Sequence, residues 1–115
     1  EGRQFPLHQG RVFIYVFDPE CRHCDEAARV MAKHNWGATK LIAVPTRQPQ
    51  FAVEFVQATG FKAGISKDVE MLRQTFQFVD PPFAIALENG YQQALLTRFD
   101  AEEPAASLRQ LGFIQ

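Results

Sequence analysis

Two cysteines separated by two residues constrain this chain more than any other feature, and they lie in the stretch Asp18-Pro19-Glu20-Cys21-Arg22-His23-Cys24. Residues 11–17, directly before it, are rich in β-branched and aromatic side chains and predict a buried strand. Residues 22–34 predict a helix, because apolar side chains recur there at helical spacing. A Cys-x-x-Cys pair at such a junction places Cys21 at a helix N-terminus, where orphan N–H groups and the positive dipole end favour a thiolate. The thiolate is the form of cysteine that attacks disulfides.

The composition narrows the class of protein. With 115 residues, 46% hydrophobic content and 11 Phe, we expect residues 1–115 to form a single domain with a packed core. The net charge of −1 implies no general attraction to nucleic acid or anionic lipid. No apolar run reaches the ~18 residues that a membrane span needs. Because Glu1-Gly2-Arg3 lacks an initiator Met, we expect a mature product, or a domain excised from a longer or membrane-anchored precursor.

The middle of the chain continues the alternation of strand and helix. Residues 40–44 predict a second buried strand. Residues 49–59 predict a helix that begins at a proline, ends before Gly60 and buries the face formed by Phe51, Ala52, Phe55 and Val56. Residues 61–65 are too short to assign. Residues 66–76 predict another helix with Ser66 as its N-cap.

The last third of the chain predicts a hairpin and a closing helix. Residues 83–87 form a third apolar strand, and Asn89-Gly90 predicts a tight turn into an antiparallel strand over residues 92–99. Asp100 with Glu103 resembles a capping box at the start of the last helix, which packs through Ala105, Leu108 and Leu111. Two parallel crossovers and one hairpin define an α/β domain, with a mixed sheet of four or five strands and helices on both faces.

Three landmarks over residues 10–111 give this chain a family resemblance. The apolar strand leads into the CxxC pair, residues 41–59 fit an inserted strand–helix unit, and residues 82–90 resemble a cis-proline strand with its Asn-Gly turn. With these landmarks the chain resembles the thioredoxin-like thiol–disulfide oxidoreductases, and most closely the extracytoplasmic TlpA-type disulfide reductases. In that register the peptide bond between Pro81 and Pro82 is expected to be cis.

The motif departs from the TlpA-type pattern at three positions. Glu20 stands where the family has an aromatic residue, and His23 stands where TlpA-type proteins usually have Pro. The dipeptide Arg22-His23 is more similar to the oxidase and isomerase branches, which place His before the second Cys. Tyr15 occupies the position of the acid that thioredoxins bury in their first strand. These departures leave the direction of electron flow and the proton acceptor for Cys24 open.

The residues and the resemblance together suggest roles for the site. Cys21, nearer the helix end and solvent, is expected to be the nucleophile and Cys24 the buried resolving thiol. Arg22 and His23 are expected to tune the redox pair, against the opposing charges of Asp18, Glu20, Asp25 and Glu26. The resemblance implies a substrate groove at Pro81, Pro82 and Phe83, with a position in the core as an equal alternative for Phe83. It also implies that the residue before the cis-proline binds the substrate backbone through its N–H and C=O.

The resemblance implies a thiol–disulfide oxidoreductase that exchanges disulfides with protein thiols and an external redox partner, without a cofactor. It further implies an extracytoplasmic site, in the bacterial periplasm or membrane-anchored facing outward, and we expect a monomer. One alternative is a non-catalytic thioredoxin-like binding module that docks partners beside Pro82. Another is a metal-thiolate carrier, which needs about four ligands. His34 lies ten residues past Cys24 and His8 is remote in sequence, so we expect no metal. Asp25 directly after the second cysteine excludes the haem-attachment pattern.

Overall fold

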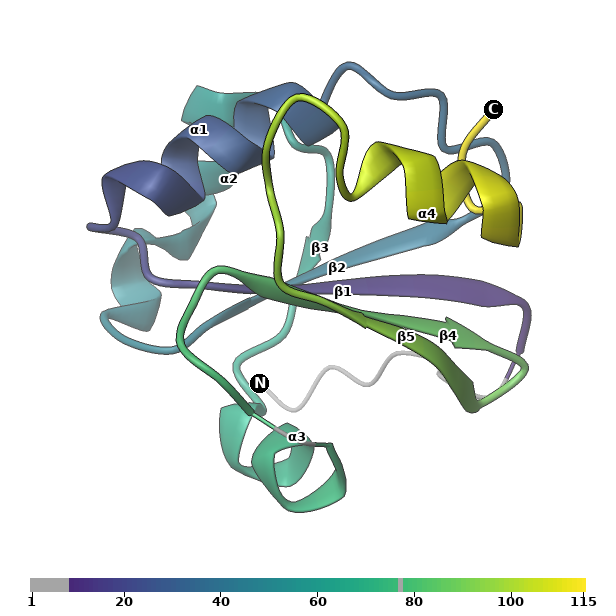
Figure 1. Ribbon diagram of the computed structural model, residues 1–115. Coiled ribbons are helices and arrows are strands. Elements are labelled where there is room, and N and C mark those ends of the chain that lie inside the picture. Colours follow the sequence, from purple (N-terminus) through teal and green to yellow (C-terminus); the bar gives the residue numbers. More distant parts are fainter. Residues whose placement is uncertain (1–8, 77) are drawn as a thin grey trace.

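The computed structural model describes residues 9–76 and 78–115. A mixed five-stranded sheet runs through its centre in the order β3-β2-β1-β4-β5 (Figure 1). The strands are β1 (Arg11–Phe17), β2 (Lys40–Pro45), β3 (Gly64–Ile65), β4 (Phe83–Glu88) and β5 (Tyr91–Leu96). β1 pairs in parallel with β2 and antiparallel with β4, which makes it the central strand. The predicted mixed sheet is confirmed, and β3 supplies its fifth strand.

Helices cover both faces of the sheet, as the sequence predicts (Figure 1). They are α1 (Arg22–Met31), the 3-10 turn η1 (Pro49–Phe51), α2 (Ala52–Thr59), α3 (Val69–Thr75) and α4 (Ala105–Leu111). α1, α2 and α4 lie on one face and α3 lies alone on the other.

The central strand β1 is apolar on both faces because both faces are covered. Phe13, Tyr15 and Phe17 pack into the larger core beneath α1, α2 and α4. The alternate side chains of β1 pack into a second core, which α3 closes with Leu72. Every β1 side chain from Val12 to Phe17 has 0% exposure, and this burial fixes the register of the strand that leads into the cysteine motif.

The first helix is shorter than predicted, since α1 ends at Met31 rather than at residue 34. The N–H groups of Lys33 and His34 donate to carbonyls three residues back, which tightens the chain out of the α-helix. The indole N–H of Trp36 also donates to the Met31 carbonyl, at 2.9 Å. These donors satisfy the orphan carbonyls at the helix end and stop it there.

Two details of the middle segment differ from the prediction. Ser66 is not an N-cap: its N–H donates to Ala43 beside the β2–β3 pairing, and its hydroxyl accepts from the N–H of Asp68, after which α3 begins. Phe51 is 42% exposed rather than part of the buried helix face. It lies in η1, whose three-residue period turns its side chain away from the face that carries Phe55.

The C-terminal hairpin forms at the predicted turn. Asn89 and Gly90 both adopt positive φ angles, 51° and 87°, which a two-residue hairpin turn of this sequence requires. β5 ends at Leu96 rather than at residue 99, because Phe99 turns inward to pack its ring against Tyr15. The Asp100 carboxylate accepts the N–H groups of Glu102 and Glu103, as a capping residue does, and α4 itself begins at Ala105.

Candidate redox site

Cys21 occupies the N-cap of α1, as the position of the motif predicts. Its backbone is extended, with φ −84° and ψ 120°, and its N–H donates to the Asp18 carbonyl at 2.9 Å. Its Sγ accepts the N–H of Cys24 at 3.3 Å, so the sulfur takes the place that a Ser or Asp oxygen takes in ordinary caps. The residue is partly exposed. The sulfur therefore lies at a helix terminus, where a substrate can reach it.

Cys24 lies in the opposite environment, fully buried beneath the first turn of α1. Burial raises the pKa of its thiol to about 12, and the nearby sulfur of Cys21 adds to this rise. The N–H of Asp18, which donates to the Cys24 Sγ at 3.4 Å, acts in the other direction without offsetting the burial. At neutral pH the inner sulfur is therefore a protonated thiol.

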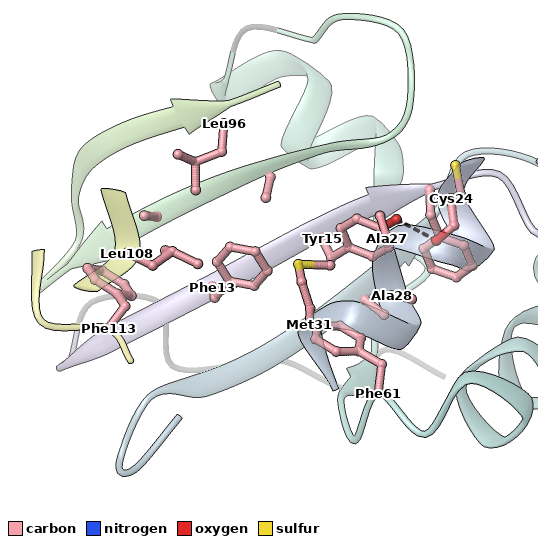
Figure 2. Close-up of a cluster of buried hydrophobic side chains, with 14 of the residues drawn as sticks. Phe13, Tyr15, Cys24, Ala27, Ala28, Met31, Phe61, Leu96, Leu108 and Phe113 are labelled. Carbon is pink, nitrogen blue, oxygen red and sulfur yellow. Dashed lines mark hydrogen bonds between the residues drawn. The ribbon is translucent and has the colours of Figure 1, made fainter. Parts of the chain in front are cut away.

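Tyr15 reaches from β1 to the same helical turn. Figure 2 shows its side chain pointing at α1, where the hydroxyl donates to the Cys24 carbonyl at 2.8 Å. Burial raises the pKa of Tyr15 far above its ordinary value, so the group is a neutral donor. Its ring packs against Phe17, Phe61 and Phe99, with centroids 5.6–5.8 Å away. The position where thioredoxins carry an acid therefore holds a fixed, uncharged hydrogen-bond donor.

The side chains between the cysteines point outward, and both are exposed. The Arg22 guanidinium lies 3.4 Å from Glu26 on the next turn, and Asp25 pairs with Arg29 at 2.7 Å. Two of the four acids that were expected to oppose a thiolate thus have cationic partners on the same helix. Arg22 and His23 lie beside Cys21 in the chain, and the donor to its sulfur is the N–H of Cys24.

The proline pair lies at the end of the sheet where the motif begins. Phe83 pairs with Val16 in the register of β4 and β1, and Pro81 and Pro82 directly precede it. The Pro81–Pro82 bond is cis, Pro82 is buried and Pro81 is partly exposed. Of the two alternatives for Phe83, a groove position and a core position, the 0% exposure of its side chain favours the core. It packs edge-on against Phe78 in the second core, 5.1 Å between ring centroids, because the register of β4 turns it toward α3.

Two features of the site are not predicted by the sequence analysis. One is the contact between the Asp18 N–H and the Cys24 sulfur. In the sequence analysis, Asp18 is treated only as a charge that opposes the thiolate. Its position three residues before Cys21 is the feature of the sequence that could have indicated a contact with the cysteine pair. The other is a surface pocket of about 210 Å³ between α1 and the segment before α4, lined by His23, Glu26, Ala27, Val30, Met31, Phe99, Asp100, Glu103 and Pro104.

A metal site was one of the alternatives for the cysteine pair. Within residues 9–76 and 78–115, no three or more His, Cys, Asp or Glu side chains gather in a group that could hold an ion. His34 lies beyond the end of α1, where its ring approaches Trp36 at 6.0 Å, and His8 falls outside the described residues.

Among the helices of residues 9–76 and 78–115, none has the length and apolar character to cross a membrane.

This chain is similar to known proteins in its three-dimensional structure. The sequence matches no protein-family model and no curated protein. The thioredoxin domain of a thiol-disulfide oxidoreductase from Bacteroides vulgatus superposes with a TM-score of 0.68 at 14% identity, covering 91% of this chain and 81% of that one. MTB DsbF gives 0.70 at 14% identity, with coverage of 91% and 81%.

A third similar structure is a secreted Mycobacterium tuberculosis disulfide oxidoreductase homologous to Escherichia coli DsbE. Its TM-score is 0.68 at 14% identity, with 90% of this chain and 81% of that chain covered. At such identities the likeness concerns the fold, and the resemblance seen in the sequence is confirmed at that level. The chain has the thioredoxin-like fold, and it carries the CxxC pair Cys21–Cys24 at the start of α1.

Proposed function

We propose that this chain is a thiol–disulfide oxidoreductase that exchanges disulfides with protein substrates through Cys21 and Cys24. The observation that carries the proposal is the contrast between the two sulfurs. Cys21 caps a helix at the surface, while Cys24 is a fully buried thiol three residues later. One sulfur is placed to meet a substrate, and the other is placed to act only on the first.

The geometry supports a two-step exchange. The Cys21 thiolate attacks a substrate disulfide, a bond forms between Cys21 and one substrate sulfur, and the other substrate sulfur leaves as a thiolate. Cys24 then attacks Cys21 Sγ and releases the second substrate sulfur, which leaves Cys21–Cys24 oxidised. The reverse sequence oxidises a substrate dithiol, and the reduction potential of the pair decides which direction operates. Neither direction requires a cofactor.

Residues around the pair have assigned roles in this proposal. Arg22 and His23 tune the stability of the Cys21 thiolate by their charge. Pro81 and Pro82 form the groove in which a substrate segment lies against the cysteines, and the position of both at this end of the sheet supports that role. The partners are protein thiols and disulfides together with an external redox partner.

We place the protein outside the cytoplasm, in the periplasm or tethered to a membrane facing outward, and as a monomer. The support is the resemblance to extracytoplasmic reductases and the secreted nature of one protein with this fold.

Reduction of insulin by dithiothreitol tests the activity. The chain should accelerate precipitation of the insulin B chain, and the Cys21→Ser and Cys24→Ser variants should not. If the unmodified protein gives the rate of dithiothreitol alone while a thioredoxin control is active, the fold serves as a binding module instead.

A further inference from the structure

The proposed function does not identify the group that accepts the thiol proton of Cys24. The inference that follows rests on that function. Cys24 has to lose its thiol proton when it attacks the mixed disulfide at Cys21. The thiol is fully buried, and its pKa is raised to about 12. A group that ionises so rarely at neutral pH needs a base close to its sulfur.

Within the described residues, three titratable residues contact Cys24 from the elements packed around it. Tyr15 of β1 donates its hydroxyl proton to the Cys24 carbonyl, Asp18 donates its backbone N–H to the Cys24 sulfur, and the Cys21 sulfur accepts the Cys24 N–H. Tyr15 is a neutral phenol that already donates its proton to a carbonyl, so it cannot accept another. Cys21 is bonded to the substrate at this stage.

The side chains of the two residues next to Cys24 in sequence do not point at its sulfur or are already paired. His23 is exposed on the outer side of α1, and the carboxylate of Asp25 accepts a hydrogen bond from Arg29 at 2.7 Å. Of the three residues that contact Cys24, Asp18 is therefore the one whose side chain has the chemistry of a base.

The backbone holds Asp18 against the reacting sulfur. Its N–H donates to the Cys24 Sγ at 3.4 Å, and its carbonyl accepts the N–H of Cys21 at 2.9 Å. Its Oδ1 accepts the N–H of Glu20 at 3.0 Å, which fixes the side chain in a local turn. The carboxylate oxygens are only four covalent bonds from the nitrogen that touches the sulfur. This short link keeps the carboxylate near Cys24, whose pKa its charge helps to raise, so a proton can pass to it directly or through one water molecule.

We propose that Asp18 is the catalytic base that accepts the Cys24 proton in the resolving step. The Cys24 S–H bond breaks, its proton passes to the Asp18 carboxylate, and the electron pair left on sulfur attacks Cys21 Sγ. The bond between Cys21 and the substrate sulfur breaks, and the substrate leaves as a thiolate that takes the proton from Asp18. Two cysteines are oxidised to one disulfide, and the substrate disulfide is reduced to two thiols, so electrons and protons balance.

If Asp18 acts only through its charge, its removal changes the rate of the resolving step in the opposite direction. A nearby carboxylate disfavours a second anion, and its charge contributes to the raised pKa of Cys24. If that were its only effect, removing the charge would make Cys24 ionise more easily and would speed the resolving step. If Asp18 is the base, removing it slows that step.

The variant Asp18→Asn separates these cases. Asn keeps the backbone N–H on the sulfur and a side-chain oxygen for the Glu20 N–H, but it accepts no proton. In single-turnover experiments with a disulfide-bonded peptide, we expect the resolving step to slow by roughly 100-fold at pH 7. Its rate should then climb with hydroxide concentration, and Asp18→Glu should recover part of it. A resolving step that is unchanged or faster in Asp18→Asn overturns the proposal.

Two controls keep this result distinct from a failure of the proposed function. Glu20→Gln removes a charge from the same segment without a contact to the sulfur, and its resolving rate should stay near that of the unmodified protein. In a Cys24→Ser background, Asp18→Asn should still form the mixed disulfide through Cys21. If Cys24→Ser alone forms none, the oxidoreductase function itself fails. If it forms one and Asp18→Asn resolves normally, only the role of Asp18 fails.

Discussion

Cys21 and Cys24 lie within one helical turn, yet one is partly exposed and the other is buried. We predict that iodoacetamide modifies Cys21 before Cys24 in the reduced protein at neutral pH. Cys21 is partly exposed at the helix N-terminus, whereas Cys24 is inaccessible and its pKa is raised to about 12. Mass spectrometry of peptides after brief alkylation measures the order. Modification of Cys24 first would reverse the assignment of nucleophile and resolving thiol.

Pro81 is the residue of the proposed groove that limits backbone recognition. It has no N–H, so only its carbonyl can bond to an extended peptide, and one docking contact is missing. We expect Pro81→Thr to raise kcat/KM with peptide disulfides roughly two- to tenfold, as one hydrogen bond of about 0.5–1.5 kcal/mol would. Steady-state kinetics on one peptide series provide the measurement. If Pro81→Thr and Pro82→Ala both leave peptide kinetics unchanged, substrate docks elsewhere.

At the scale of elements, α2 is joined to the sheet by aromatic packing. Phe55 is buried and stacks on Phe17 of β1 with ring centroids 4.3 Å apart, while Phe51 at the start of the same segment is 42% exposed. We expect Phe55→Ala to lower the free energy of unfolding by about 3–5 kcal/mol. Phe51→Ala should change it by less than about 0.5 kcal/mol. Urea denaturation of both variants compares them, and equal losses would contradict the register of η1 and α2.

The elements most accessible from sequence were those whose signals are local. The apolar run of β1 and the Asn89-Gly90 turn needed no knowledge of the rest of the fold. The end of α1 was misplaced because it depends on Trp36, a side chain from beyond the helix that donates to the Met31 carbonyl. The two alternatives for Phe83 stayed open because the face that a strand residue takes is set by its register with β1, which no local pattern reports.

At the scale of the whole molecule, the buried titrating groups make stability depend on pH. The pKa of Cys24 is raised on folding from 9.0 to about 12, so both states hold the proton below pH 9. Above pH 9 the unfolded chain releases it while the folded chain retains it, and stability falls as pH rises toward 12. Tyr15, whose pKa is also raised, adds in the same direction. Denaturation of the reduced protein between pH 8 and 11 should show this loss, and Cys24→Ala should show less of it.

The site can be predicted only in part from the sequence, because most of its contacts join residues that are far apart in the chain. The motif identifies the two sulfurs, and its place before a predicted helix puts Cys21 at the N-cap and Cys24 in the first turn. The contacts that set their chemistry are tertiary: Tyr15 reaches the Cys24 carbonyl across the core, and the pocket beside His23 closes only when residues 99–104 pack near α1. The Asp18 contact is local, but it depends on how the chain turns between β1 and α1.

The most direct test of the central claim is to trap the mixed disulfide. Cys24→Ser removes the resolving thiol and keeps Cys21 at the helix cap, so exchange should stop after its first step. We predict that this variant forms a covalent complex with a disulfide-bonded peptide, joined through Cys21 and released by dithiothreitol, and that Cys21→Ser forms none. Non-reducing gels and mass spectrometry of the joined peptides give the readout. Absence of the complex with Cys24→Ser, or an equal yield with Cys21→Ser, would contradict a redox pair in which Cys21 attacks first.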